Sequence, residues 1–175
     1  MNPAMYTLHF DGMLRIEGNE QLHKNGLLGY GWLIKKDHIE IAHGFGIFAR
    51  RGQTGSSVAE YLALIEGLDA LTDLRVERET VEVHGDAKCV IDQMDGVSSV
   101  SSPQLWKLHL RARKLTQRFH SLTWVWVPRR ENKQADALSR RGLRYLRYDI
   151  FPNINKARSN DMAPLVDLRI HMRAT

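Results

Sequence analysis

The sequence contains a single cysteine, Cys89, so an internal disulfide is excluded and the fold depends on a packed core. Low cysteine usage is typical of a reducing compartment, and we expect a cytoplasmic protein. No run of 18 apolar residues occurs, which argues against a membrane-spanning helix and a membrane partner. The first residues also lack the basic and then apolar segments of a secretory signal.

What is present indicates a globular chain. Its 175 residues are 43% apolar and 26% charged, which suits one domain with a sizeable core. The formal charge of +5 is unevenly placed: residues 1–139 hold 17 Lys/Arg and 17 Asp/Glu, whereas residues 140–175 hold 8 and 3. A basic end suits a polyanionic partner, and a solvated terminus is the alternative.

The segment Tyr6–Gly12 predicts a central strand. Tyr6, Leu8 and Phe10 alternate with polar residues, as expected for a strand with one buried face. Gly12 is expected to end the strand, which places Asp11 at its carboxyl end and at the rim of the sheet.

The remaining pattern predicts a mixed sheet with helices on both faces, an α/β fold. The predicted further strands are Leu28–Lys36, Ile39–Ala49, Thr80–His84 and Ser121–Val127, with a tight turn at Asp37-His38. The predicted helices are Ser57–Leu74, Ala87–Met94, one from Pro103 or Gln104 to Phe119, and Lys133–Tyr145. The segments 12–26 and 50–56 are predicted loops.

Four carboxylates stand at the ends of these elements: Asp11, Glu60, Asp86 and Asp136. Each has a local explanation. Glu60 stands three residues after Ser57, as in a capping box; Asp86 can cap the following helix; Asp136 can offset a helix dipole. If the first and fourth strands are neighbours, however, all four converge at one rim. Carboxylates gathered without a Lys or Arg among them repel one another unless divalent cations neutralise them, and oxygen ligands favour Mg²⁺ or Mn²⁺.

Four segments carry a family resemblance. They are Phe10-Asp11-Gly12, Val58-Ala59-Glu60-Tyr61-Leu62-Ala63-Leu64-Ile65-Glu66-Gly67-Leu68, His84-Gly85-Asp86-Ala87-Lys88, and Val127-Pro128-Arg129-Arg130-Glu131-Asn132-Lys133-Gln134-Ala135-Asp136-Ala137-Leu138. In this order and spacing the chain resembles a type 1 ribonuclease H. The resemblance implies a five-stranded mixed sheet, three antiparallel strands and then two parallel ones, flanked by helices. It also implies a catalytic domain at residues 1–146, followed by a basic C-terminal extension at 147–175.

The resemblance further implies that the RNA strand of RNA/DNA hybrids is hydrolysed to 5′-phosphate and 3′-hydroxyl ends with two Mg²⁺ or Mn²⁺ ions. By analogy, Asp11 contacts both ions, Glu60 and Asp86 hold the first, and Asp136 holds the second. Double-stranded RNA is a second candidate substrate, and no obligate protein partner is evident.

The chain departs from the family pattern in several places, one of which is a longer loop after Gly12. The loop Trp126–Asn132 lacks the histidine that many members carry there, and an arginine cannot replace it as a general base. Ser56 and Ser57 stand where two asparagines usually read the minor groove. Val97–Ser102 contains no Lys or Arg, so the basic protrusion of many bacterial members is absent. The expected substrate-binding residues are Gly12, Ser56, Ser57, Arg129, Arg130 and Asn132.

Two other functions compete with this interpretation. A non-catalytic nucleic-acid-binding module on the same fold is the alternative, although such a module gains nothing from carboxylates placed against phosphates. A 3′–5′ exonuclease of related fold would carry an acidic residue two positions after Asp11, where this chain has Met13.

Overall fold

The structure is a computed structural model that describes residues 4–15, 27–49, 55–148 and 170–174. Its strands are β1 (Met5–Arg15), β2 (Leu27–Lys36), β3 (Ile39–Ala49), β4 (Thr80–Gly85), β5 (Ser121–Trp126) and β6 (Ile170–Ala174). Its helices are α1 (Ser56–Asp73), α2 (Lys88–Met94), α3 (Pro103–Thr116) and α4 (Lys133–Tyr148), with a 3-10 turn η2 (Arg129–Glu131) before α4. The strands form one sheet in the order β5-β4-β1-β2-β3-β6.

The sheet confirms the predicted arrangement around the first strand. β1 pairs antiparallel with β2 and parallel with β4, and β5 continues the parallel half. The predicted turn between β2 and β3 is also confirmed. Asp37 and His38 both adopt positive φ angles, 47° and 71°, as a two-residue hairpin turn requires. The predicted five strands are therefore present, and β6 adds a sixth beside β3.

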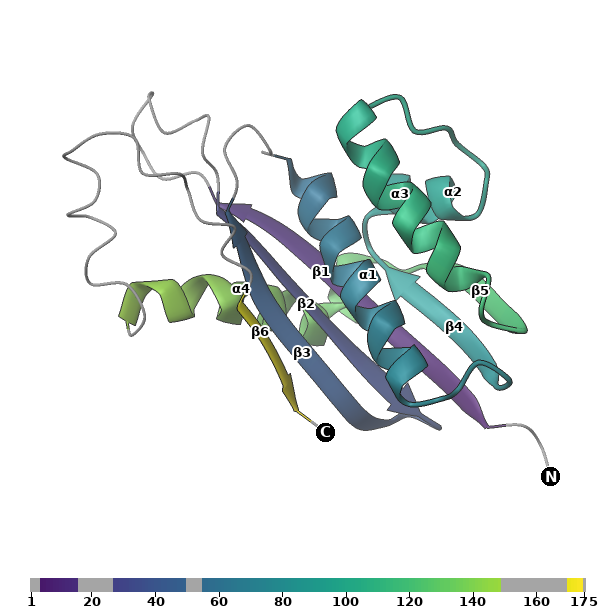
Figure 1. Ribbon diagram of the computed structural model, residues 1–175. Helices are drawn as coiled ribbons and strands as arrows, with labels where there is room; N and C mark the ends of the chain where they lie inside the picture. The colour runs from purple at the N-terminus through teal and green to yellow at the C-terminus, as the bar shows by residue number, and fades with distance from the viewer. Residues whose placement is uncertain (1–3, 16–26, 50–54, 149–169, 175) are drawn as a thin grey trace.

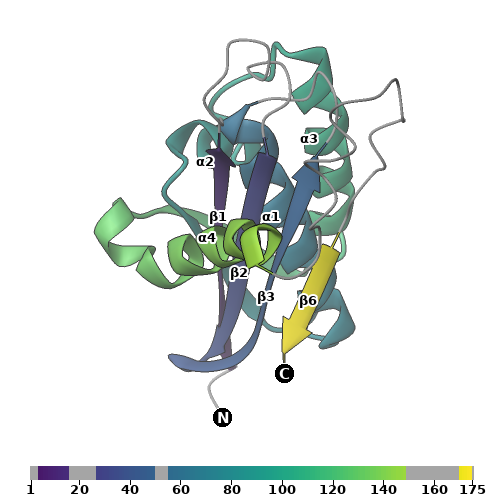
Figure 2. The ribbon, with the colours of Figure 1, turned by 90° about the vertical axis from the view of Figure 1, so that its left-hand side faces the viewer.

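Helices cover both faces of the sheet, as predicted (Figures 1 and 2). α1 packs on β1 and β2 on one face, with α3 against α1. On the other face, α4 packs on β1, β2 and β3. The core between the sheet and α1 is apolar and tightly packed, and Leu8, Phe10, Trp32 and Tyr61 are almost fully buried. Within the described ranges, no helix combines the length and apolar character needed to cross a membrane.

β1 does not end at Gly12, as the sequence predicted. It continues to Arg15, because β2 extends far enough in the other direction for Leu27 to pair with that residue. Asp11 consequently lies inside the strand, opposite Gly31, and only 4% of it is exposed. The parallel neighbour β4 does end here, since Gly85 pairs with Phe10. The rim near Asp11 is thus formed by the end of β4 rather than by the end of β1.

The predicted C-terminal extension is described in part. α4 reaches Tyr148, three residues beyond its predicted end, and β6 lies within the extension. Residues 149–169 lie outside the described residues, as do most of the predicted loop 12–26 and residues 50–54. The boundary at residue 146 stays a prediction.

Candidate active site

Three of the four predicted carboxylates meet in the structure. Asp11 on β1, Glu60 on α1 and Asp86 just after β4 each offer an oxygen, and these oxygens lie within 4.8 Å of one another. The parallel pairing of β1 with β4 brings Asp11 and Asp86 together. α1 packs on β1 and contributes Glu60. The topology therefore places side chains from three distant segments at one point.

Glu60 reaches this point because Gly12 lets α1 approach β1. A Cβ at residue 12 would overlap the backbone of Ala59 and Glu60, so only glycine permits this contact. The Gly12 amide also donates a hydrogen bond to the Glu60 carboxylate, which favours the ionised form. Gly12, predicted to bind substrate, thus has a positioning role in the structure.

The predicted capping box is wrong. The residue that caps α1 is Gly55, not Ser57, so Ser56 and Ser57 lie in the first turn of the helix. No side chain caps the helix end by a hydrogen bond, and Glu60 is 8% exposed. Ser56 is exposed and Ser57 is half-buried at the same end of α1 as Glu60. Their predicted contact with substrate stays a prediction.

Ser139 is a site residue that the sequence analysis missed. Its hydroxyl donates a 2.5 Å hydrogen bond to Oδ2 of Asp11, although 128 residues separate the two. Gly31 makes this possible, because a Cβ there would collide with Leu138 and Ser139 of α4. The available signal was the helical spacing from Asp136, since residues three apart share a face of a helix.

Burial controls the protonation of two of the three carboxylates. It raises the pKa of Asp11 to about 6; the Ser139 hydrogen bond opposes this shift, and the nearby charges of Asp86 and Asp136 reinforce it. Burial likewise raises the pKa of Glu60 well above its ordinary value, with Asp11 and Asp86 adding to the effect. In the trio of Asp11, Glu60 and Asp86, the first two therefore keep their protons to a higher pH than an exposed carboxyl group does when no cation balances the charge.

Asp136 is held differently from the trio. Nη2 of Arg129 lies 2.6 Å from its Oδ1, and Nε of Arg140 lies 2.8 Å from its Oδ2. Burial alone would raise the pKa of Asp136, but the hydrogen bonds from Arg140 and Arg129 outweigh it and lower that pKa. The expectation that no cation stands among the four carboxylates is therefore wrong. Asp136 is close enough to influence the pKa of Asp11, but it lies outside the close group of three.

Asn132 braces the site from within. Its Nδ2 donates to the Phe10 carbonyl at 2.8 Å and to Oδ1 of Asp86 at 3.1 Å, and the residue is 1% exposed. The amide thus connects the loop before α4 to β1 and to Asp86, one of the candidate metal ligands. Its predicted contact with substrate stays untested, while its observed contacts are internal.

Exposed groups surround this core of the site. Arg129 and Arg130 are 65% and 79% exposed, and the second forms only a distant pair with Glu131 at 3.6 Å. Trp126 is also exposed, and its Nε1 donates to the Asp86 carbonyl at 3.2 Å. Trp124 is partly buried and packs against the core. Both guanidinium groups are therefore accessible from solvent at the rim, although that of Arg129 is paired with Asp136.

The trio fits a hard divalent cation. Its donors are all carboxylate oxygens, which Mg²⁺ and Mn²⁺ prefer. Oε2 of Glu60 is buried and has no hydrogen-bond partner among the described residues. A buried oxygen without a donor is costly, and a bound cation would satisfy it. The donor set, the close spacing and this oxygen together indicate a metal site.

The sequence profile of a family described as reverse transcriptase-like matches residues 17–142. The chain belongs to this ribonuclease H-like family. The N-terminal RNase H domain of a Mycobacterium tuberculosis protein, solved as a fusion with maltose binding protein, is similar in structure. It has a TM-score of 0.69 and 31% identity, covering 81% of this chain and 94% of that one. The predicted type 1 ribonuclease H resemblance and fold are confirmed.

Two further relatives support the assignment. Ribonuclease HI of Halobacterium salinarum is 33% identical over 136 residues, covering 77% of this chain and 62% of that protein. The structure of LC11-RNase H1 in complex with an RNA/DNA hybrid has a TM-score of 0.65 and 27% identity, covering 76% of this chain and 92% of that one. The match to the curated Mycobacterium tuberculosis protein, named as bifunctional, is 39% identical over 88 residues, half of this chain. It spans only 24% of that protein's length.

Proposed function

We propose that the protein is a metal-dependent endoribonuclease that hydrolyses the RNA strand of RNA/DNA hybrids. The observation that carries the proposal is the convergence of Asp11, Glu60 and Asp86 within 4.8 Å on a ribonuclease H fold. The ribonuclease HI relative and the hybrid-bound neighbour support this choice of reaction and substrate. The products would carry 5′-phosphate and 3′-hydroxyl ends.

Each carboxylate has a proposed role in holding two Mg²⁺ or Mn²⁺ ions. Asp11 would contact both, Glu60 and Asp86 would hold the first, and Asp136 would hold the second. When bound, such ions lower the pKa of an attacking water and stabilise a leaving 3′ oxygen. Arg129 and Arg140 bind both oxygens of Asp136. To hold the second ion, Asp136 must therefore share its carboxylate between that ion and these two arginines.

Other residues prepare the site for this chemistry. Ser139 fixes the orientation of Asp11 through their hydrogen bond. Asn132 holds the Asp86 carboxylate toward β1, where the first ion is expected. The exposed guanidinium groups of Arg129 and Arg130 can attract the phosphate backbone. Glu60 would also contact a 2′-hydroxyl, the group that distinguishes an RNA strand from DNA.

A cleavage assay tests the proposal. A hybrid labelled on the RNA strand, and a second one labelled on the DNA strand, are incubated with Mg²⁺ or Mn²⁺ and in excess EDTA. We expect internal cuts in the RNA alone, only with a cation, and no cuts by the Asp11→Asn variant. Binding without cleavage under all conditions would instead favour a nucleic-acid-binding module, and double-stranded RNA serves as the competing substrate.

We also propose a cytoplasmic location, supported by Cys89, the only cysteine in the sequence, which is free and exposed. Cell fractionation with the native protein would test it, and recovery from an oxidising compartment would contradict it.

A further inference from the structure

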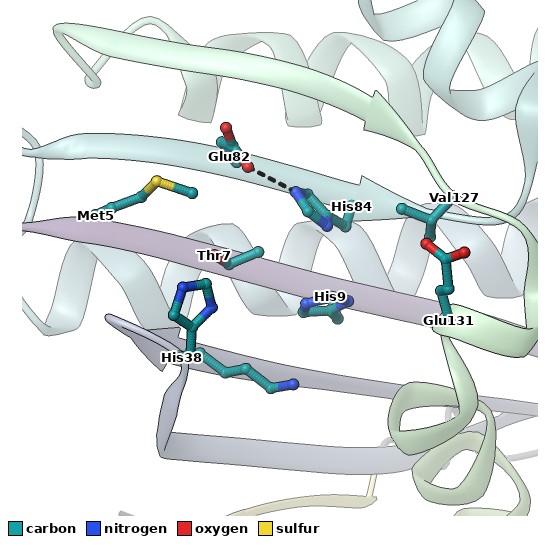
Figure 3. Close-up of a pocket in the computed structure, with 9 residues that line it drawn as sticks. Met5, Thr7, His9, His38, Glu82, His84, Val127 and Glu131 are labelled. Carbon is teal, nitrogen blue, oxygen red and sulfur yellow. Dashed lines mark hydrogen bonds and ion pairs between the residues drawn. The ribbon is translucent and has the colours of Figure 1, made fainter.

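A second polar site lies on the opposite face of the sheet from α1. It is a pocket of about 360 Å³ over strands β1 and β4, bordered by the β2–β3 turn and by the segment that precedes α4. Thr7 and His9 of β1 and Glu82 and His84 of β4 line it, as Figure 3 shows. Parallel strands are usually buried on both faces, so a polar pocket on such strands requires an explanation.

Two histidines in this pocket form a close pair. His9 and His84 are direct partners in the register of β1 and β4, and their ring centroids are 4.8 Å apart at an interplanar angle of 64°. Imidazole nitrogens bind Zn²⁺ at about 2.0–2.1 Å, so two rings on one tetrahedral ion have centroids about 5 Å apart. The observed separation therefore matches that of two rings sharing one cation.

Each histidine has an acceptor for its second nitrogen. Nε2 of His84 lies 2.9 Å from Oε2 of Glu82, and a carboxylate accepts the N–H. The other His84 nitrogen is on the side of the ring facing His9 (Figure 3). For His9, the neighbouring group is the Asn132 side chain. Oδ1 of Asn132 is buried without a hydrogen-bond partner among the described residues, and so can accept from the second nitrogen of His9.

Metal-binding histidines characteristically donate their other N–H to a carboxylate or an amide oxygen, which fixes the ring and makes it a better ligand. We propose that His9 and His84 bind one divalent cation of the class that imidazole prefers, such as Zn²⁺, Co²⁺ or Ni²⁺. Water completes the coordination. This site differs from the carboxylate trio in its nitrogen donors and in its place on the sheet, and it does not depend on the proposed nuclease activity.

The test is a Zn²⁺ titration of the Asp11→Asn variant, in which the carboxylate trio is weakened as a competitor. Nitrogen-15 NMR of the histidine rings reports which imidazoles bind. We expect one ion per chain, with shifts in the rings of His9 and His84. His84→Gln should weaken Zn²⁺ binding at least tenfold, and Glu82→Gln about tenfold through loss of the orienting carboxylate.

A matched control is available on β3. Nδ1 of His43 lies 2.8 Å from Glu40, so this residue is also an imidazole paired with a carboxylate. His43→Gln should leave Zn²⁺ affinity unchanged. The proposal is overturned if the rings of His9 and His84 do not shift, or if His84→Gln binds Zn²⁺ as tightly as its parent. The NMR measurement needs no histidine variant, so it tests the proposal even if those variants fail to fold.

Discussion

Nη2 of Arg129 lies 2.6 Å from Oδ1 of Asp136, so an exposed cation occupies one of the oxygens expected to hold a metal ion. Arg140, one helical turn beyond Asp136, occupies the other oxygen. Both arginines therefore compete with a divalent cation for this carboxylate.

Replacing Arg129 should strengthen metal binding. An exposed ion pair contributes about 0.2–1 kcal/mol, so Arg129→Gln should lower the Kd for Mn²⁺ by about 1.5- to 5-fold. Calorimetric titration of the protein without substrate measures this change. Arg130→Gln is the matched control, because Arg130 has its closest acidic partner in Glu131 at 3.6 Å and should leave the Kd unchanged. An equal effect of both variants would show that general charge, and not the contact with Asp136, is responsible.

The buried carboxylates should make the metal-free protein more stable in mild acid than at neutral pH. The pKa of Asp11 is about 6 in the folded protein, above its ordinary value of 3.8. The folded state therefore holds a proton that the unfolded state loses, and the free energy of unfolding falls as pH rises from about 4 to about 6. Glu60, whose pKa is also raised, contributes in the same direction.

The substitution Asp11→Asn removes the cost of ionising the buried Asp11 carboxylate. In EDTA at pH 7, the substitution should raise the free energy of unfolding by up to about 3 kcal/mol, and by little at pH 4. Urea unfolding at several pH values measures both effects. Saturating Mn²⁺ should shrink or reverse the difference, because the ion stabilises only the folded protein that binds it. A variant less stable than its parent at pH 7 in EDTA would contradict the assigned pKa shift of Asp11.

Asn132 should matter for stability as well as for the site. Its amide donates two buried hydrogen bonds, to Phe10 and to Asp86. Asn132→Ala leaves both acceptors without this donor and should cost about 1–3 kcal/mol in the free energy of unfolding. The neighbouring exposed residue Lys133 provides the control, since Lys133→Ala should change stability by less than about 0.5 kcal/mol. Equal losses in the two variants would argue against the bracing role of Asn132.

The order of elements was predictable because it depends on local patterns. Alternation of apolar residues located β1, and the two-residue turn at Asp37 located the hairpin. The extent of β1 was not predictable in this way, because its residues beyond Gly12 are held by pairing with β2, which is distant in sequence. Gly12 was interpreted as a turn residue. Gly12 instead lacks a side chain, which permits α1 to approach β1 closely.

The candidate site was predictable to a similar degree. The carboxylates could be identified from their positions at element ends, and three of them converge. The contact of Ser139 with Asp11 depends on how closely α4 approaches the sheet, which no local pattern reveals. The pair of Arg140 with Asp136 was accessible, since residues four apart on a helix are neighbours. That spacing indicates one of the two cationic partners of Asp136.

The C-terminal extension is predicted to contribute affinity for nucleic acid through its charge. Not every arginine near it is available: Arg140 binds Asp136, and Arg141 lies 4.8 Å over the ring of Phe45. Lys156 and Arg158 belong to the predicted basic extension and lie outside the described residues. The double substitution Lys156→Gln with Arg158→Gln removes charge while retaining β6, which truncation would delete from the edge of β3.

If both residues neutralise phosphates, this double variant should bind a hybrid more weakly and reduce the slope of log affinity against log salt by about 1.8. Single-turnover cleavage at saturating substrate should be unchanged, because the carboxylates are intact. Arg75→Gln with Arg78→Gln is the matched control: both residues are exposed in the connection between α1 and β4, beyond the end of α1 opposite Glu60. If the two double variants share the parent's affinity and salt slope, the extension does not contact the substrate through these charges.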